Sequence, residues 1–253
     1  MIETNHIPSN HPRAKSLAIR QLLANGFKSG LVVSEGLIAH GRGETFDYLI
    51  GEKTSSYAFD AIKAASSLLL LAKRPVISVN GNTAALCPKE IVDLAHETSS
   101  SIEVNLFHRN KRRENLIAET LKKNGANNIL GVGQKKFLKI PELTSNRRQV
   151  DPEGIFLADV VLVPLEDGDR TQALINMQKK VITVDLNPLS RTAQNATISI
   201  IDNIVRAIPE LVKTSTQLKQ MSRNSLLKIL NNFNNKHNIE NSLKIIRRWN
   251  CEQ

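Results

Sequence analysis

The sequence predicts an α/β protein with a mainly parallel sheet that is covered by helices. Segments rich in β-branched residues alternate with helix-like segments along the 253 residues of the chain, and such alternation is typical of parallel sheets. Residues 158–165 (ADVVLVPL) are almost continuously apolar, as expected for a strand that is buried on both faces. The chain length fits one large α/β domain, or one domain with a small appendage.

The first half of the chain contains four predicted strands and four predicted helices. The strands are expected at residues 30–34, 75–80, 102–107 and 127–132. The helices are expected at residues 12–25, 54–73 and 88–97, followed by a charged helix that ends at residue 123. Ser9 or Asn10 is expected to cap the first helix, and Gly26 to end it. Thr54 is expected to cap the second helix, and Pro88 to begin the third.

The second half ends in a helical tail. Its predicted strands cover residues 158–165, 180–186 and 197–202, with a helix at residues 171–179. Residues 207–230 have helical periodicity, an Asn-rich stretch follows at residues 231–238, and another helix is expected at residues 239–249. We therefore expect residues 1–205 to form the main domain. Residues 206–253 are expected to form a helical appendage, which is a candidate for contacts in an oligomer.

The composition is that of an ordinary globular protein, with 41% apolar and 23% charged residues. It excludes a disordered, collagen-like or coiled-coil chain. No apolar run approaches the roughly 20 residues of a membrane-spanning helix, and no segment resembling a secretory signal opens the chain. Cys87 and Cys251 form neither a disulfide framework nor a zinc site. We expect a reduced, cytoplasmic, soluble protein that does not bind membranes.

The formal net charge of +10 is concentrated in two segments. Residues 109–148 carry 11 Lys/Arg against 3 Asp/Glu, and residues 206–253 carry 9 against 3. A basic chain suggests nucleic acid, an anionic small molecule or a basic outer surface. Because aromatic residues make up only 4% of the chain, side chains on which bases could stack are scarce. Anionic small molecules are therefore favoured over nucleic acid, and residues 109–113 are interpreted as a solvated face.

Polar residues follow several of the predicted strands. The clusters are Asn80-Gly81-Asn82, His108-Arg109, residues 166–171 (EDGDRT) and residues 187–191 (NPLSR). In open parallel sheets, ligands bind outside the carboxyl ends of the strands, so clusters that converge on one edge indicate a functional site. Asn, Asp and Gly also build ordinary turns, and this is the alternative for any single cluster.

A second candidate feature is the segment of residues 36–44 (GLIAHGRGE), in which Gly41 and Gly43 flank Arg42. Glycine permits close approach of the backbone, and arginine offers a fork of donors to phosphate or carboxylate. The segment resembles a phosphate-cradling loop in kind, but it is not a Walker A loop because no Gly-Lys-Ser/Thr follows. An irregular surface turn is the alternative. His40 by itself is more typical of a structural histidine than of a catalytic base.

Glu166, Asp167 and Asp169 are candidate ligands for Mg²⁺, which prefers one or two carboxylates together with substrate phosphates. Alternatively, Asp169 caps the following helix. Gly131-Val-Gly133 follows a predicted strand, but the dinucleotide-binding motif is incomplete because residue 136 is Lys. No nucleophile motif surrounds either cysteine, and no Gly-x-Ser-x-Gly sequence is present. The residues alone therefore indicate an α/β enzyme that acts on a phosphate ligand and depends on a nucleotide.

Seven longer segments are more specific than these patterns. They are SNHPRAKSLAIR (9–20), GLIAHGRGETFDYLIGE (36–52), SVNGNTAAL (78–86), NLFHR (105–109), VPLEDGDRT (163–171), DLNPLSRTA (185–193) and DNIVRA (202–207). Together they resemble the archaeal phosphopantothenate synthetases, also called 4-phosphopantoate–β-alanine ligases. The matching segments run in order from residue 9 to about residue 207, whereas the tail matches only in its helical character.

The resemblance implies a Rossmann-like core for residues 1–205, a homodimer and an activity. The family condenses 4-phosphopantoate with β-alanine to 4-phosphopantothenate, using ATP and releasing AMP and diphosphate, in the synthesis of coenzyme A. The nucleotide-contacting positions of the family fall here on Arg20, Arg42, Asp185, Leu186, Asn187, Arg191, Thr192, Asn203 and Ile204.

The chemistry of this reaction suggests a role for each candidate side chain. Transfer of AMP to the carboxylate would give a phosphopantoyl adenylate, from which β-alanine displaces AMP. Arginines would stabilise the charge on the α-phosphate, with Mg²⁺ neutralising the diphosphate, and Asp185 or Asn187 would hydrogen-bond the ribose or adenine. The predicted catalytic residues are Arg42, His40 and Arg191, and Arg20 supports them. The predicted substrate-binding residues are Asn80, Asn82, Arg109 and Arg170. Of these, Arg109 and Arg170 are expected to bind the substrate phosphate. A non-catalytic phosphate-ligand or nucleotide-binding module on the same fold, and an RNA-binding protein that uses residues 206–253, are the alternatives.

Overall fold

The computed structural model describes residues 10–11, 13–133, 136–165 and 167–248. At its centre is a six-stranded sheet in which every pairing is parallel. The strands are β1 (Pro75–Val79), β2 (Ser101–Val104), β3 (Ile129–Leu130), β6 (Val160–Val163), β7 (Lys180–Val184) and β8 (Ile198–Ile200). Their order is β3-β2-β1-β6-β7-β8, which is the strand order of the Rossmann fold. The predicted α/β architecture is confirmed.

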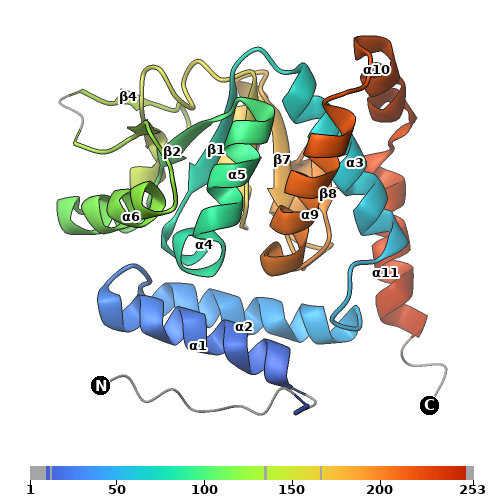
Figure 1. Cartoon of the computed structure of the whole chain (residues 1–253), viewed down its shortest axis with the longest axis horizontal. Coiled ribbons are helices and arrows are strands. Elements are labelled where there is room, and N and C mark those ends of the chain that lie inside the picture. The colour runs from blue at the N-terminus through green and yellow to red at the C-terminus, as the bar shows by residue number, and fades with distance from the viewer. Residues whose placement is uncertain (1–9, 12, 134–135, 166, 249–253) are drawn as a thin grey trace.

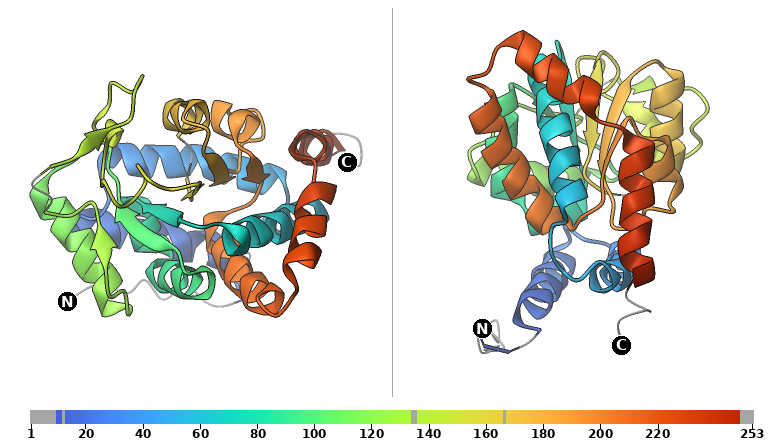
Figure 2. Two further views of the ribbon diagram at one scale, coloured as in Figure 1. Left: turned by 90° about the horizontal axis from the view of Figure 1, so that it is seen from above. Right: turned by 90° about the vertical axis from the view of Figure 1, so that its right-hand side faces the viewer.

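Helices cover both faces of this sheet (Figures 1 and 2). They are α3 (Ser56–Leu71), α4 (Gly81–Leu86), α5 (Pro88–Thr98), α6 (Lys111–Lys123), α7 (Gly168–Asn176), α8 (Arg191–Asn195), α9 (Ile204–Leu218), α10 (Arg223–Asn232) and α11 (Asn235–Arg248). The side chains of strand β6 contribute to a hydrophobic core on each face of the sheet. Its Leu162 belongs to the larger core, with α3, α5 and α9, whereas Val161 and Val163 belong to a second core with Ile155 and Leu174 of α7. The strand is therefore buried on both faces, as predicted.

A short antiparallel pair lies outside the main sheet. It joins β4 (Leu138–Lys139) to β5 (Gln149–Val150), with a 3₁₀ turn at Asn146–Arg148 between them. The side-chain amide of Asn105, just after β2, donates to the carbonyl oxygens of Arg147 and Gln149, at 3.2 and 3.1 Å. These bonds hold the segment against the carboxyl end of β2.

The first two helices form a hairpin beneath the carboxyl edge of the sheet (Figure 1). They are α1 (Ala14–Ser29) and α2 (Ser34–Leu49). The strand predicted at residues 30–34 is wrong, because this segment is the turn of the hairpin. Gly26 does not end α1; Gly30 does, with φ of +86°. At Gly26 a Cβ would lie only 2.9 Å from the Cβ of Ala85, so this glycine permits close packing inside the helix.

Three predicted helix caps also differ from the structure. The cap position of α1 belongs to Arg13 and not to Asn10, and Ser9 lies outside the described residues. Helix α3 is capped by Ser55, whose hydroxyl accepts a backbone N–H bond, whereas Thr54 donates to Asp202 at 2.7 Å. At the start of α7 the cap position belongs to Asp167, whose side chain makes no cap bond, and Asp169 lies in the first helical turn. Errors of one or two residues are expected where neighbouring residues have similar capping preferences.

The C-terminal helices pack onto the same core as the sheet. The boundary expected at residue 206 falls inside α9, which packs against α3 and α5 and buries Ala207, Ile208 and Leu211. Helices α10 and α11 pack against α3 in turn. The helix expected at residues 207–230 is interrupted earlier, since α9 ends at Leu218. In the described ranges, no helix combines the length and the apolar character that crossing a membrane requires.

Candidate active site

A cavity of about 360 Å³ lies between α2 and the carboxyl edge of the sheet. Its size is typical of small-molecule sites. Residues that follow five neighbouring strands line it, including Asn80 after β1, His108 after β2, Leu165 after β6, Asp185 after β7 and Asn203 after β8. The cavity therefore spans the gap between β1 and β6, where the strand order reverses and Rossmann-like proteins bind ligands. The predicted convergence of polar clusters on this edge is confirmed for Asn80, Asn82, His108 and Asn187. It is wrong for the cluster at residues 166–171, of which no described residue lines the cavity.

Residues 36–44 form part of helix α2, so the predicted loop or surface turn is wrong. Gly36, His40, Gly43 and Asp47 recur at three- and four-residue spacing and therefore share one helix face. The first three line the cavity, and Asp47 is buried. A Cβ on Gly36 would lie 2.4 Å from Oδ1 of Asn82, whose amide donates to the carbonyl of Gly36 at 2.8 Å. Gly36 thus lets the helix approach Asn82 at the edge of the sheet.

Helix α2 runs along the edge of the sheet from β1 towards β8 (Figure 1). Near its start, Gly36 meets Asn82, which follows β1. Further along the helix, a Cβ at Gly43 would contact Leu186, which follows β7, at 3.5 Å. Near its end, Asp47 accepts a bond from Asn203, which follows β8. The helix forms one wall of the whole cavity.

Six of the nine predicted nucleotide-binding positions line the cavity. They are Arg42, Asp185, Leu186, Asn187, Asn203 and Ile204. The carboxylate of Asp185 accepts bonds from the backbone of Asn187, at 2.9 Å, and from the hydroxyl of Ser190. That hydroxyl also caps α8. The turn after β7 is therefore pinned by a buried carboxylate, and it presents backbone groups to the cavity.

Arg20, Arg191 and Thr192 lie outside this cavity. Arg20 on α1 pairs with Glu44 on α2, its Nε being 2.9 Å from each carboxylate oxygen. Arg191 begins α8 and pairs with Asp169, with 2.7 Å between Nη2 and Oδ1. Arg191 borders a second hollow of about 510 Å³. Thr192 is fully buried.

The two arginines predicted to bind the substrate phosphate also lie outside the cavity. Arg170 is buried, and its Nη1 donates to Ser78 and Asn105, both at 2.8 Å. Burial lowers its pKa to about 10. Arg109 donates to the carbonyl oxygens of Gln149 and Gly131, at 3.0 and 2.7 Å. Both guanidinium groups hold the chain together rather than face the cavity.

Arg113 and Arg147 line the cavity instead. Arg113 donates to the carbonyl oxygens of Leu31, at 3.1 Å, and His108, at 2.8 Å. Its pKa is lowered by burial and, further, by the charge of Arg147. Arg147 pairs with Asp167, while its buried Nε has no hydrogen-bond partner among the described residues. Sequence reasoning missed both: Arg113 falls in the run interpreted as a solvated face, and only the concentration of charge over residues 109–148 signalled Arg147.

The carboxylates predicted to bind Mg²⁺ are engaged with arginines. Asp167 pairs with Arg147 and Arg170, and Asp169 has the partner described above. Burial alone would raise the pKa of Asp167, but the two arginines outweigh it and hold the pKa below its ordinary value. Glu166 lies outside the described residues, and within them no three acidic, histidine or cysteine side chains gather as metal ligands. The described carboxylates do not fit a metal site held by the protein alone.

His40, Asn80 and Asn82 also line the cavity. Burial lowers the pKa of His40 below its ordinary value, so its ring is neutral at pH 7. The side-chain oxygen of Asn80 accepts the backbone N–H of Thr83 at 3.0 Å and caps α4. Asn82 holds α2, as described above. Both asparagines therefore have structural bonds as well as a place in the cavity wall.

This fold and this cavity define a Rossmann-like α/β protein with a cavity of small-molecule size along the carboxyl edge of its sheet. The family model for phosphopantothenate/pantothenate synthetases matches residues 57–249, and the chain belongs to that family. Its relatives include the 4-phosphopantoate–β-alanine ligase of Thermococcus kodakarensis, 51% identical over 96% of this chain and 92% of the relative. The ligase of the same name from Methanosarcina mazei is 50% identical over 95% of this chain and 94% of the relative. The resemblance seen in the sequence is confirmed.

Proposed function

We propose that this protein is a ligase that condenses 4-phosphopantoate with β-alanine to 4-phosphopantothenate, in the synthesis of coenzyme A. The observation that carries this proposal is the identity of about half of all residues with ligases of that name, over nearly the whole of both chains. The cavity supports it, because it offers one continuous site along the edge of the sheet for a nucleotide and an acid substrate.

The strand order suggests how two ligands share the cavity. The end near β7 and β8 carries Asp185, Asn187 and Asn203, and we assign it to the nucleoside of ATP. The end near β1 and β2 carries the two cations Arg113 and Arg147. We assign this end to 4-phosphopantoate, with the two arginines in the role that Arg109 and Arg170 were predicted to fill, because arginine suits phosphate recognition.

The proposed reaction has two steps. An oxygen of the 4-phosphopantoate carboxylate attacks the α-phosphorus of ATP, diphosphate leaves, and an acyl adenylate forms. The amine of β-alanine then attacks the acyl carbon, the bond to AMP breaks, and the nitrogen loses a proton. Neutral His40, in the wall of the cavity, is the candidate acceptor for that proton. Arg42 is the candidate donor to the charge that builds on the α-phosphate.

Arg20 and Arg191 can contact the nucleotide only if Glu44 and Asp169 release them. The pair of Arg191 with Asp169 is exposed on both sides, and exposed ion pairs contribute little to stability. We propose that the phosphates of ATP displace these carboxylates. ATP would enter as its Mg²⁺ complex, and the metal would supply charge neutralisation on the phosphate oxygens.

We also propose a cytoplasmic homodimer, as the resemblance implies. Four large hydrophobic side chains are exposed on the α1–α2 hairpin: Leu22, Phe27, Ile38 and Tyr48. Exposed side chains of this kind are candidates for an interface between two copies of the chain. The hairpin is therefore a better candidate for the dimer contact than the C-terminal tail. Light scattering of the purified protein should give twice the mass of the chain. The Ile38→Asp variant should give the mass of a single chain.

AMP release tests the proposed function. The purified protein is incubated with ATP, Mg²⁺, 4-phosphopantoate and β-alanine, and each component is omitted in turn. AMP that forms only with the complete set would establish the ligase. ADP in place of AMP would reject the adenylate route in favour of an acyl phosphate. ATP binding without any turnover would support the alternative of a non-catalytic nucleotide-binding module.

A further inference from the structure

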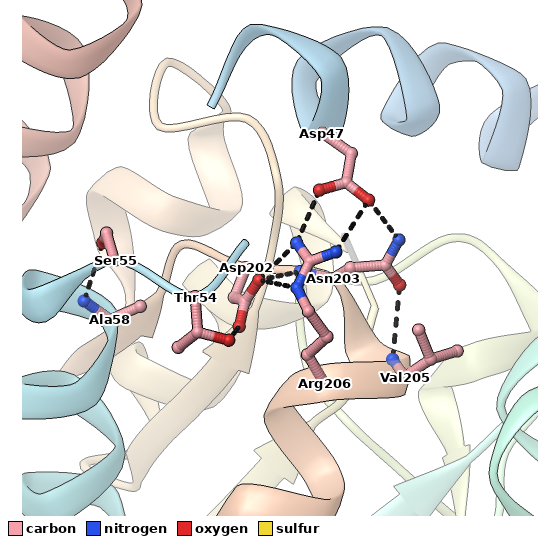
Figure 3. A network of polar contacts seen from close by, with 8 residues as sticks. All are labelled: Asp47, Thr54, Ser55, Ala58, Asp202, Asn203, Val205 and Arg206. Carbon is pink, nitrogen blue, oxygen red and sulfur yellow. Dashed lines mark hydrogen bonds and ion pairs between the residues drawn. The ribbon is translucent and has the colours of Figure 1, made fainter. Parts of the chain in front are cut away.

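A buried ion network joins the end of α2 to the start of α9 (Figure 3). Arg206 contacts Asp47 through two nitrogens, at 2.5 Å to Oδ1 and 3.2 Å to Oδ2. It also contacts Oδ1 of Asp202, at 2.6 and 2.9 Å, and Thr54 donates to the other oxygen of Asp202. Only 4% of Asp47 and 1% of Asp202 is exposed. We call these residues, with Asn203, the Arg206 network.

The network also fixes Asn203, which lines the cavity. The side-chain amide of Asn203 donates to Oδ2 of Asp47 at 2.7 Å, and its oxygen accepts the backbone N–H of Val205 at 3.2 Å. Its backbone N–H donates to Asp202 at 2.8 Å. Both ends of the amide are thus used inside the protein, so the network decides which part of Asn203 faces a ligand.

The network sets the position of one end of α2. Asp47 shares a helix face with His40 and Gly43, which line the cavity. At the other end of the helix, the bond between Asn82 and Gly36 sets the separation from the sheet. The separation at the β7–β8 end, where we place the nucleoside, depends on Asp47 and its partners.

Stability alone is a weak explanation for this arrangement. Burying two carboxylates and a guanidinium group costs solvation, and well-packed apolar residues often replace buried ion pairs without loss. Arg206 itself does not line the cavity, and its side chain is 24% exposed. A forked, planar donor that bridges two carboxylates in fixed directions specifies a geometry that apolar contacts would leave loose.

We propose that Arg206 is a positioning residue for the nucleotide. It holds α2 and the β8–α9 turn at the separation that the nucleoside requires, and with Asp47 it orients Asn203. The inference rests on the proposed function for the identity of the ligand.

The test uses Arg206→Lys and Arg206→Gln in the full chain. Lysine keeps the charge but cannot bridge both carboxylates with a fork. We expect both variants to raise the Kd for a non-hydrolysable ATP analogue, and the KM for ATP, at least tenfold. The KM for 4-phosphopantoate should change less than twofold. Asp47→Asn should raise the same two constants, and combined with Arg206→Gln it should add little, because the two residues act together.

Lys179→Met is the matched control. Lys179 is another buried cation, which donates to the carbonyl oxygens of Phe156 and Ala158, both at 2.7 Å, at the opposite edge of the sheet. This variant should lower Tm without changing either nucleotide constant. The positioning role is overturned if Arg206→Lys also lowers Tm without changing the nucleotide constants. It is likewise overturned if this variant raises the KM of every substrate equally. Should the Arg206 variants not fold, Asp47→Asn decides between the same outcomes.

The binding measurement separates this inference from the proposed function. A wild-type protein that binds the analogue but releases no AMP would reject the proposed function, and the Kd values would still test Arg206. A wild-type protein that is an active ligase, with unchanged nucleotide constants in the Arg206 variants, would reject the inference alone.

Discussion

Glu103 is a carboxylic acid in the middle of strand β2, with no exposed surface. Its oxygens accept the backbone N–H groups of Asp151 and Ile155, at 3.0 and 2.6 Å. Burial raises its pKa to about 7, although the two hydrogen bonds oppose the shift. A Cβ on Gly154 would lie 2.1 Å from the carboxylate, so the loop before β6 folds closely around this one side chain.

The raised pKa makes stability depend on pH. Because the pKa of Glu103 is higher in the folded than in the unfolded chain, its contribution is full below about pH 4.5 and is lost as the pH rises through 7. Glu103→Gln cannot ionise. The free energy of unfolding of the wild type, relative to the variant, should therefore fall by up to about 3 kcal/mol from pH 4.5 to pH 8. Urea unfolding of both proteins at several pH values measures this difference, and a constant difference would contradict it.

Arg42 is exposed to the cavity from α2. Arg42→Ala should lower kcat/KM at least about 30-fold, since one lost preorganised donor costs about 2 kcal/mol or more in the transition state. Steady-state kinetics on the folded variant measure this loss. Arg74→Ala is the control, because Arg74 is exposed at the opposite edge of the sheet. Equal rates for the two variants would remove Arg42 from the mechanism.

Among the elements, α2 is unusual because a helix of 16 residues contains three glycines. Glycine inside a helix is unfavourable by roughly 0.5–1 kcal/mol relative to alanine, which is why the segment looks like a loop in the sequence. The environment of each glycine differs. Gly36 touches Asn82, Gly43 is near Leu186, and a Cβ at Gly41 would meet nothing within 4 Å. Tertiary contact, rather than helix propensity, explains Gly36.

The glycines give a matched pair of variants. Gly41→Ala should raise the free energy of unfolding by about 0.5–1 kcal/mol, because the side chain enters open space and favours the helix. Gly36→Ala should lower it by about 1–3 kcal/mol, because the Cβ collides with Asn82. Thermal unfolding, together with the KM for 4-phosphopantoate, distinguishes them. A rise in the free energy of unfolding for both variants would show that helix propensity alone governs α2.

At the scale of the whole molecule, the helical tail completes the sheet layer that it covers. Helix α9 buries Ile208 and Leu211 against α3 and α5. It also supplies Arg206, without which Asp47 and Asp202 would be buried carboxylates lacking their cation. The contacts with α3, α5 and Asp47 join the tail to residues that are more than a hundred positions earlier in the chain.

A chain that ends at residue 205 should therefore not fold. Each buried Ile or Leu of α9 contributes about 1.5–3 kcal/mol, and two unpaired carboxylates add to the loss. The total is comparable to the stability of a typical domain, about 5–15 kcal/mol. Circular dichroism during heating measures the outcome. A sharp thermal transition in the fragment would show instead that residues 206–253 are a separable appendage.

Much of the fold could be predicted from short stretches of sequence. Pro88 begins α5, and the charged helix ends at Lys123, as expected. The apolar run at residues 158–165 contains the buried strand β6. These predictions succeed because capping and periodicity act within a few residues. The strand predicted at residues 30–34 was wrong because three apolar residues in a hairpin turn resemble a short strand. The helix end predicted at Gly26 was wrong because this glycine is explained by its contact with Ala85, which is remote in sequence.

The sequence by itself determined the alternation of strands and helices, the carboxyl edge as the place where polar residues meet around a cavity, and the family. Only the tertiary structure decided which arginines face the cavity. Arg109 and Arg170 carry the same charge as Arg113 and Arg147, but groups that are remote in the sequence use their donors. Arg109 donates to the carbonyl oxygens of Gln149 and Gly131, and Arg170 donates to the side chains of Ser78 and Asn105. A side chain's partners depend on where the whole chain places those groups. Local periodicity therefore predicts elements well and the direction of a long charged side chain poorly.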